Sequence, residues 1–174
     1  MDIDFTNIRY LKTGTPLQQQ AHTVLVNSRI MDKLAAYTPL LCGTIPINIA
    51  IAGSDLDIIC QWQNKETFLS DITLLFSGYE DFSIRENTSI DAVIASFICD
   101  GFPVEIFGQS IPTQEQNAYQ HMVIEHKILQ QKGEAFRNKI IALKEQGYKT
   151  EPAFAALLGL MGDPYTALLL YKIH

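Results

Sequence analysis

Residues 41–62, LCGTIPINIAIAGSDLDIICQW, restrict the fold more than any other segment, because two aspartates lie within an apolar stretch. Polar residues occupy positions 55, 57, 61 and 63, whereas Leu, Ile, Cys and Trp occupy positions 56, 58, 60 and 62. This period of two predicts a strand buried on one face. The alternative, a helix in which Ser54 and Asp57 form a capping box, needs a period of 3.6 that these residues do not follow. The strand places Asp55 and Asp57 on the same face.

The rest of the first 112 residues predicts two helices and four more strands. Thr15 and Pro16 are typical of a helix start, and the apolar spacing extends that helix over residues 17–37. Asn64 begins a second helix over residues 64–76. Asp100-Gly101 is a strong hairpin signal between two of the strands. The strands are predicted at residues 40–44, 81–87, 91–100 and 103–108.

After residue 113 the pattern is helical. One long helix is predicted over about residues 114–146, with Gly133 as a candidate break. Two short helices follow at residues 151–159 and 164–173, with Thr150 and Asp163 as their caps. Together these elements predict an α+β fold, a mixed sheet of about five strands flanked by helices with a helical C-terminal part. We expect one domain over residues 1–174, with the sheet and its helices in 1–112 and the helical subregion in 113–174.

Composition excludes several classes of protein. Of 174 residues, 47% are hydrophobic, which is enough for a sizeable core, and the net charge of -6 without a basic run argues against duplex nucleic acid as the main partner. Cys42, Cys60 and Cys99 lie in apolar surroundings and are expected to be buried thiols in a reducing compartment. The acidic, polar start and the lack of a bilayer-spanning apolar run predict a cytoplasmic protein without membrane contact.

Two carboxylates on one face of a partly buried strand repel each other unless a proton or a cation intervenes. Oxygen ligands favour Mg²⁺ or Mn²⁺. Glu105 is a third acid, alone in the apolar segment FPVEIFG. If its strand pairs beside that of Asp55, at a spacing of about 4.8 Å, all three acids reach the same ions. Such a set can hold two metal ions for phosphoryl or nucleotidyl transfer, whereas the simpler alternative for Glu105 is an acid that faces solvent.

Gly43 and Thr44 come shortly before these acids, with Thr44 eleven residues ahead of Asp55. A glycine lets the backbone approach a bound group closely, and threonine offers a hydroxyl and an amide to a phosphate. The same pair is also typical of an ordinary turn.

In these segments the chain resembles the nucleotidyltransferase superfamily, which includes DNA polymerase beta and the kanamycin nucleotidyltransferases. Three blocks, Cys42-Gly43-Thr44, Asp55-Leu56-Asp57 and Val104-Glu105-Ile106, match its pattern in order. The resemblance implies that Asp55, Asp57 and Glu105 are catalytic metal ligands for Mg²⁺ or Mn²⁺, and that Gly43, Thr44 and Ser54 contact a nucleotide. Ile47 stands where an arginine is common in the superfamily.

A second resemblance covers more of the chain, from about Arg29 to the C-terminus. The segments GTIPI, GSDLDIIC, EIFGQ, HMVIEHKIL, KEQGYKTEPAFA and GDPY are similar to a small bacterial family known only as a domain of unknown function. This resemblance implies a nucleotidyltransferase-like fold and no particular substrate.

Two residues of the C-terminal part are candidate substrate contacts. His121 lies four residues before Glu125, on the same helix face, but the absence of a third nitrogen or sulfur ligand at suitable spacing argues against zinc. The simpler interpretation of His121 is a polar neighbour of the core. Lys149 is a candidate phosphate contact, and a solvated lysine is the alternative.

The sequence therefore favours a Mg²⁺-dependent nucleotidyltransferase that moves a nucleoside monophosphate from a nucleoside triphosphate to a hydroxyl of a small molecule or protein. The first alternative is a catalytically silent nucleotide-binding or protein-interaction module, such as one half of a toxin–antitoxin pair. The second is a metal-dependent phosphohydrolase.

Overall fold

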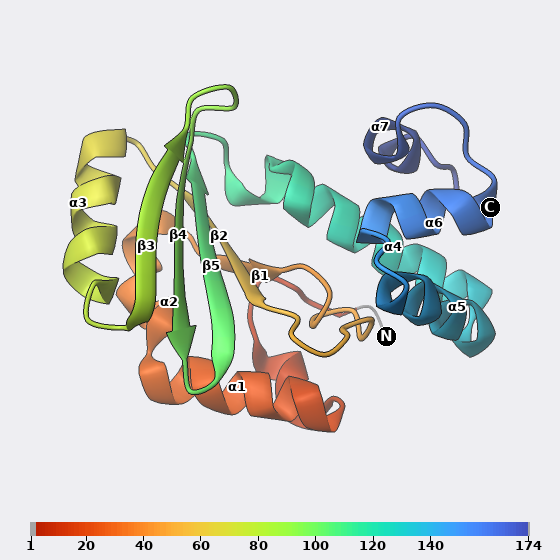
Figure 1. Ribbon diagram of the computed structural model, residues 1–174, viewed down its shortest axis with the longest axis horizontal. Coiled ribbons are helices and arrows are strands. Elements are labelled where there is room, and N and C mark those ends of the chain that lie inside the picture. Colours follow the sequence, from red (N-terminus) through yellow and green to blue (C-terminus); the bar gives the residue numbers. More distant parts are fainter. Residues whose placement is uncertain (1–2, 174) are drawn as a thin grey trace.

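The computed structural model describes residues 3–173 and shows a central sheet with helices around it (Figure 1). The strands are β1 (Leu40–Cys42), β2 (Leu56–Gln61), β3 (Glu80–Asn87), β4 (Ala92–Cys99) and β5 (Phe102–Gln109). The helices are α1 (Pro16–Ser28), α2 (Ile30–Lys33), α3 (Lys65–Phe76), α4 (Asn117–Lys132), α5 (Glu134–Glu145), α6 (Thr150–Leu158) and α7 (Pro164–Leu169). Short 3₁₀ helices cover Arg9–Thr13, Ala35–Tyr37 and Thr113–Glu115.

The sheet has five strands in the order β1-β2-β5-β4-β3. Only β2 and β5 are parallel, and the other neighbours are antiparallel. The predicted α+β class with a mixed sheet is therefore confirmed. In the parallel pair Asp57 lies directly opposite Glu105, so the pairing on which a shared metal site depends is present.

The alternation in β2 separates two hydrophobic clusters, one on each face of the sheet. Leu56, Ile58, Cys60 and Trp62 belong to the cluster that includes side chains of α1 and α3. Ile59, on the face that carries Asp57, belongs to a second cluster with side chains of α4, α5, α6 and α7. Figure 1 shows these C-terminal helices gathered at the right of the sheet and α3 at its left. The face of β2 that carries Asp57 is thereby turned toward the C-terminal helices.

The first predicted helix is wrong in its length. Thr15 begins α1 with a capping box to Gln18, as its sequence suggests, but α1 ends at Ser28 and Arg29 adopts a left-handed conformation with φ 56°. The Ser28 hydroxyl donates a hydrogen bond to the Val24 carbonyl at 2.7 Å, and such bonds from serine compete with regular helix geometry. The short helix α2 and a 3₁₀ turn replace the remainder.

The helical segment predicted over residues 114–146 is interrupted at its candidate break, because Gly133, at φ 77°, separates α4 from α5. Thr150 is the first residue of α6 instead of its cap, and Lys149 takes the cap position without a side-chain hydrogen bond. Asp163 caps α7 as predicted, since its carboxylate accepts a hydrogen bond from the Thr166 N–H at 2.8 Å. The hairpin at Asp100 is confirmed, with φ 47° there.

Two expectations from composition are tested by the described residues. The three cysteines are buried free thiols, as predicted. Within residues 3–173, no helix combines the length and apolar character needed to cross a membrane.

A glycine controls the contact between α3 and the sheet. A Cβ at Gly108 in β5 would overlap the ring of Phe68, which is fully buried. We predict that Gly108→Ala lowers the free energy of unfolding by about 1–3 kcal/mol through overpacking. At this chain length each kcal/mol lowers Tm by roughly 2–4 °C.

Thermal unfolding followed by circular dichroism measures the effect. Gly78→Ala is the matched control, because a Cβ there would meet no atom within 4 Å. An unchanged Tm for Gly108→Ala would contradict the packing of Phe68 against β5.

Candidate active site

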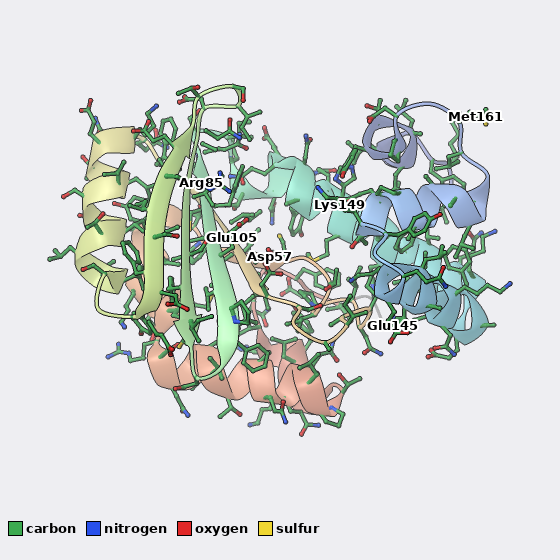
Figure 2. The ribbon with its side chains drawn as sticks, in the orientation of Figure 1. Asp57, Arg85, Glu105, Glu145, Lys149 and Met161 are labelled. Atoms are coloured by element: carbon green, nitrogen blue, oxygen red, sulfur yellow. The ribbon has the colours of Figure 1, made fainter. Side chains whose placement is uncertain are left out.

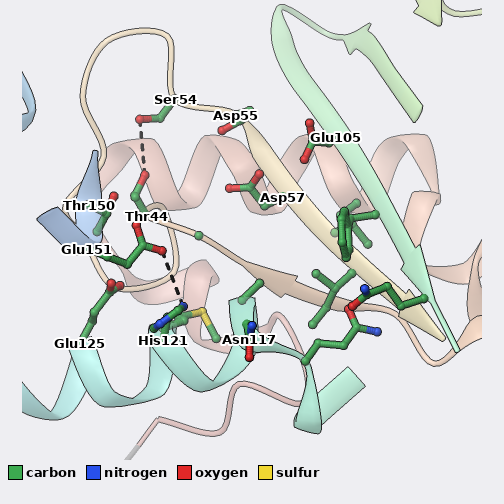
Figure 3. A pocket seen from close by; sticks show the side chains of 18 of the residues that line it. Thr44, Ser54, Asp55, Asp57, Glu105, Asn117, His121, Glu125, Thr150 and Glu151 are labelled. Atoms are coloured by element: carbon green, nitrogen blue, oxygen red, sulfur yellow. Dashed lines mark hydrogen bonds and ion pairs between the residues drawn. The ribbon is translucent and has the colours of Figure 1, made fainter. Parts of the chain in front are cut away.

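Three acidic residues, one in β2, one in β5 and one directly before β2, lie together in the structure. Asp57 in β2 faces Glu105 in β5 across the parallel pair, and Asp55 immediately precedes β2. Figure 3 shows the three carboxyl groups on the same side of these strands. The structure therefore brings together the three acids that the sequence singles out.

Burial and mutual repulsion determine the ionisation of this group. Burial and the charges of Asp55, Glu105 and Glu151 together raise the pKa of Asp57 from 3.8 to about 8; burial is the largest cause, and Lys144 opposes the increase. Burial and Asp55 also raise the pKa of Glu105. In the absence of a cation, Asp57 is therefore largely protonated at neutral pH. A divalent cation would favour its ionised form.

Gly43 allows the backbone to pass beside the Asp57 carboxyl group. It follows β1, whose last residue Cys42 pairs with Asp57, and it has φ +78°, where side chains are disfavoured. A Cβ at this position would overlap the Oδ2 atom of Asp57. Both the conformation and the lack of space therefore require glycine here.

The segment between β1 and β2 is stabilised by its own hydroxyl groups. The Ser54 hydroxyl accepts a hydrogen bond from the Ile51 N–H at 3.0 Å and one from the Thr44 hydroxyl at 3.4 Å. The Thr44 carbonyl accepts from the Ile49 N–H at 3.0 Å. Thr44 and Ser54 consequently lie next to each other, beside the acids.

Side chains from distant helices bind the carbonyl groups of the same segment. Gln18 of α1 donates to the Ile45 and Pro46 carbonyls at 2.9 and 3.0 Å. Arg137 of α5 donates to the Ile47 carbonyl at 2.6 Å. Lys144 of α5 donates to the Ile49 carbonyl at 2.8 Å.

Ile47 is a core residue. Its side chain is 2% exposed and belongs to the second hydrophobic cluster. The position at which an arginine is common in the superfamily is therefore part of the core.

A cavity of about 540 Å³ lies between the sheet edge and helices α4, α5 and α6, within the usual size range of small-molecule sites. On the sheet side it is lined by Gly43, Thr44, Ser54, Asp55, Asp57 and Glu105. On the helical side it is lined by Asn117, His121, Glu125, Lys144, Thr150 and Glu151. Figure 3 shows these two walls facing each other.

Of the two candidate substrate contacts in the C-terminal part, His121 lines the cavity and Lys149 does not. His121 lines the cavity, with Nε2 3.0 Å from the Tyr165 carbonyl oxygen and Nδ1 3.7 Å from Oε1 of Glu151. Lys149 is exposed at the start of α6 (Figure 2) and is not among the residues that line the cavity. The structure therefore does not place Lys149 with the other candidates.

Sequence reasoning missed Glu125, Lys144 and Glu151 as cavity residues. Glu125 shares the buried face of α4 with Met122 and Leu129, and Lys144 lies one turn after the buried Ile140. A charged residue at an apolar position of a helix was the available signal for these two. Glu151 carried no comparable signal, since an acid in the first turn of a helix is common.

Burial shifts the pKa values of Lys144 and Glu125 in opposite directions. It lowers the pKa of Lys144 to about 8, although Glu125 and Asp57 oppose the decrease. It raises the pKa of Glu125 well above its usual range, and Glu151 adds to that increase. These side chains form a second, largely buried polar group across the cavity from Asp57.

The carboxyl groups of the cavity are possible ligands for a divalent metal. Residues 3–173 contain no cluster of three or more His, Cys, Asp or Glu side chains already arranged around a metal position. Mg²⁺ normally takes one or two carboxylates and fills its remaining positions with water and phosphate oxygens. A buried carboxyl group next to two further acids fits that need, because a cation would relieve their repulsion.

Comparison with solved structures identifies the fold. The chain is similar to the RNA terminal uridylyl transferase Cid1, with a TM-score of 0.56, 11% identity, and coverage of 72% of this chain and 40% of Cid1. For the GLD-2/RNP-8 complex the TM-score is 0.56 at 13% identity, and the match covers 82% of this chain and 56% of the matched chain. For the polymerase core of TRAMP the TM-score is 0.51 at 10% identity, and the match covers 92% of this chain and 50% of the matched chain. The predicted nucleotidyltransferase-like fold is thereby confirmed, although the chain spans only about half the length of these structures.

Sequence comparisons are more specific. No curated protein sequence matches this chain. The model of the family described as a domain of unknown function, DUF4269, matches residues 23–171, which is most of the chain. The protein therefore belongs to the DUF4269 family.

Proposed function

We propose that the protein is a Mg²⁺-dependent nucleotidyltransferase that moves a nucleoside monophosphate from a nucleoside triphosphate to a hydroxyl acceptor. The observation that carries this proposal is the buried carboxyl group of Asp57, held beside Asp55 and Glu105 where burial and the repulsion of these acids raise its pKa to about 8. Such an arrangement is unfavourable in the empty protein and becomes favourable when a cation binds.

The three acids have distinct places in this proposal. Asp55 and Asp57 would hold Mg²⁺ or Mn²⁺, which when bound neutralises charge on the transferred phosphoryl group. Glu105 lies opposite Asp57, where it either completes the ligand set or accepts the proton of the acceptor hydroxyl.

The triphosphate would lie between the β1–β2 segment and α5. Gly43 offers backbone close to Asp57, and Thr44 and Ser54 offer hydroxyl groups on the same side of the cavity. Lys144 is the only lysine or arginine among the described residues that line the cavity, and it supplies a positive charge. Cid1, which has the same fold, has been solved with MgGTP bound, at a TM-score of 0.57 and 12% identity, and this supports a metal–nucleotide ligand.

The acceptor would be a small molecule or a protein side chain. A net charge of -6 and an acidic cavity disfavour a polyanion such as duplex nucleic acid. The free buried cysteines suit the reducing cytoplasm. Because residues from both the sheet and the C-terminal helices line the cavity, we treat the chain as one functional unit.

Calorimetric titration of ATP, GTP, CTP and UTP tests the nucleotide site. We predict that at least one binds in Mg²⁺ and none binds in excess chelator. Asp57→Asn should weaken that binding by at least about tenfold, or roughly 1.4 kcal/mol. Asp81→Asn is the matched control, because Asp81 is an exposed acid in β3 outside the cavity.

Binding that survives both the chelator and Asp57→Asn would contradict the metal role of Asp57. The same triphosphate is then incubated with Mg²⁺ and no acceptor. Rapid release of phosphate would contradict the transferase proposal and support the alternative, a metal-dependent phosphohydrolase.

The raised pKa of Asp57 predicts a particular pH dependence of stability. Between about pH 4 and pH 8 the unfolded chain has lost this proton whereas the folded protein retains it, so the contribution of Asp57 to stability falls as the pH rises through this window. Asp57→Asn keeps a neutral side chain throughout. In chelator at pH 8, the variant should therefore exceed wild type in free energy of unfolding by at least about 1 kcal/mol.

Urea unfolding at several pH values measures this difference, which should disappear near pH 4. Addition of Mg²⁺ at pH 8 should stabilise wild type and leave Asp57→Asn unchanged. A wild type that is more stable than Asp57→Asn at pH 8 in chelator would show that Asp57 is not held in an unfavourable environment.

A further inference from the structure

Helices cover only part of the sheet face that carries the acids. The opposite face of β3, β4 and β5 packs into the hydrophobic cluster that includes side chains of α1 and α3. On the face that carries Asp57, the second cluster takes side chains from β1 and β2 and, at its margin, Phe107 of β5, but none from β3 or β4 among the described residues. The C-terminal helices therefore pack on the β1–β2 half of this face and leave its β3–β4 half without a helix.

A row of polar side chains runs from the acids across this uncovered half. The strand register places Glu105 opposite Asp57 in β2 on one side and opposite Ser96 in β4 on the other. Ser96 in turn lies opposite Ser83 in β3. Directly paired residues share a face, so the two serines lie on the same face as the acids, where Ser96 is partly exposed and Ser83 is exposed. At a strand spacing of about 4.8 Å, the row continues roughly 10 Å beyond Glu105.

Arg85 stands at the far end of this row. It follows Ser83 by two residues in β3, and therefore lies on the same face. Burial and Asp55 raise the pKa of Glu105, and the positive charge of Arg85 opposes that increase. Figure 2 shows Arg85, Glu105 and Asp57 in this order across the sheet. Arg85 is the only lysine or arginine in the five strands.

The side chains of this row are not used by the fold itself. Within the described residues, the hydroxyl groups of Ser83 and Ser96 form no hydrogen bond, and the guanidinium group of Arg85 forms neither a hydrogen bond nor an ion pair. By contrast, the hydroxyl groups of Thr44 and Ser54, on the other side of the acids, bond to each other. A ligand that lies along the row can therefore use its hydroxyl and guanidinium groups without breaking a contact of the fold.

The position of Glu105 determines which substrate meets this row. In the proposed reaction the triphosphate lies by the β1–β2 segment and Lys144, on the side of Asp57 that faces away from β5. The acceptor hydroxyl must come close to Glu105 and the metal. With the nucleotide on the β2 side, the open approach to Glu105 is from the β4 side, over Ser96.

We propose that Ser96, Ser83 and Arg85 bind the acceptor, and that the acceptor is a small molecule with a hydroxyl at one end and a single anionic group, a phosphate or a carboxylate, at the other. Arginine binds either anion through two parallel hydrogen bonds, and the serines complement a polar body between the two ends. One guanidinium group matches one anionic group, whereas a nucleic-acid strand presents a phosphate at every nucleotide. This inference rests on the proposed function, since it identifies the class of acceptor for that reaction.

Glucose 6-phosphate, glucuronate and glucose test the proposal, because they share a hexose ring and differ in one group. That group is a phosphate ester, a carboxylate and a hydroxyl, respectively. The sugars are titrated calorimetrically in chelator, which removes any metal that would attract an anion. At least one anionic sugar should bind at least about tenfold more tightly than glucose, and the tighter of the two identifies the anion. Arg85→Gln should reduce this preference to about threefold or less.

Arg9→Gln is the matched control, because Arg9 is an exposed arginine in the 3₁₀ helix Arg9–Thr13, outside the sheet. Its preference for the anionic sugar should equal that of wild type. Arg85→Lys keeps the positive charge and should retain a larger preference than Arg85→Gln. Thermal unfolding confirms that each variant is folded. A preference that is the same in Arg85→Gln and wild type would place the anion elsewhere and overturn the inference.

Triphosphate binding in Mg²⁺ is measured in the same proteins to separate the two proposals. Intact triphosphate binding with loss of the sugar preference in Arg85→Gln supports the acceptor site. Loss of triphosphate binding in Arg85→Gln with the sugar preference unchanged would assign Arg85 to the nucleotide and overturn the inference. Equal affinity of wild type for the three sugars, with triphosphate binding intact, would overturn the inference and leave the transferase proposal standing.

An anion preference that depends on Arg85, in a protein that binds no triphosphate, would sustain the anion site and refute the transferase. A short single-stranded oligoadenylate tests whether the anionic group belongs to the end of a nucleic acid. Tighter binding of this oligonucleotide than of either anionic sugar, lost in Arg85→Gln, would overturn the small-molecule assignment.

Discussion

The parallel pairing of β2 and β5 is the interaction on which the site depends. It places Asp57 opposite Glu105 on one face and, by the same register, directs Leu56 and Val104 into the core on the other face. A shift of one residue would bury the acids and expose the apolar side chains, so the burial of the core residues also maintains the position of the carboxyl groups. The energy that holds three repelling acids together thus comes from the opposite face of the sheet.

The segment between β1 and β2 connects this sheet edge to distant helices. Gln18 of α1 and Arg137 and Lys144 of α5 each donate hydrogen bonds to its carbonyl groups. Lys144 also lines the cavity, so the group that fixes the segment is itself close to the acids. The geometry of Gly43 beside Asp57 therefore depends on how α5 packs, which ties the helical C-terminal part to the chemistry of the sheet.

Local patterns predicted the features that depend on local sequence. The period of two in β2 and the lone acid Glu105 identified the strands and their acids, because burial on one face imposes that spacing. The break at Arg29 was not predictable, since an arginine in a left-handed conformation leaves no compositional signal. Glu125 and Lys144 occupy apolar positions of their helices, which marks them as unusual, but the packing of α4 and α5 against the sheet edge decides that they reach this cavity. That packing also leaves Lys149 outside the cavity lining.

Diffraction at the manganese absorption edge, from crystals grown with Mn²⁺ and a non-hydrolysable triphosphate, would locate the metal. We predict an anomalous peak coordinated by Asp57 and Asp55, with the triphosphate beside Gly43 and Thr44. An ordered triphosphate without a metal at these carboxylates, or a manganese ion bound only elsewhere, would contradict it.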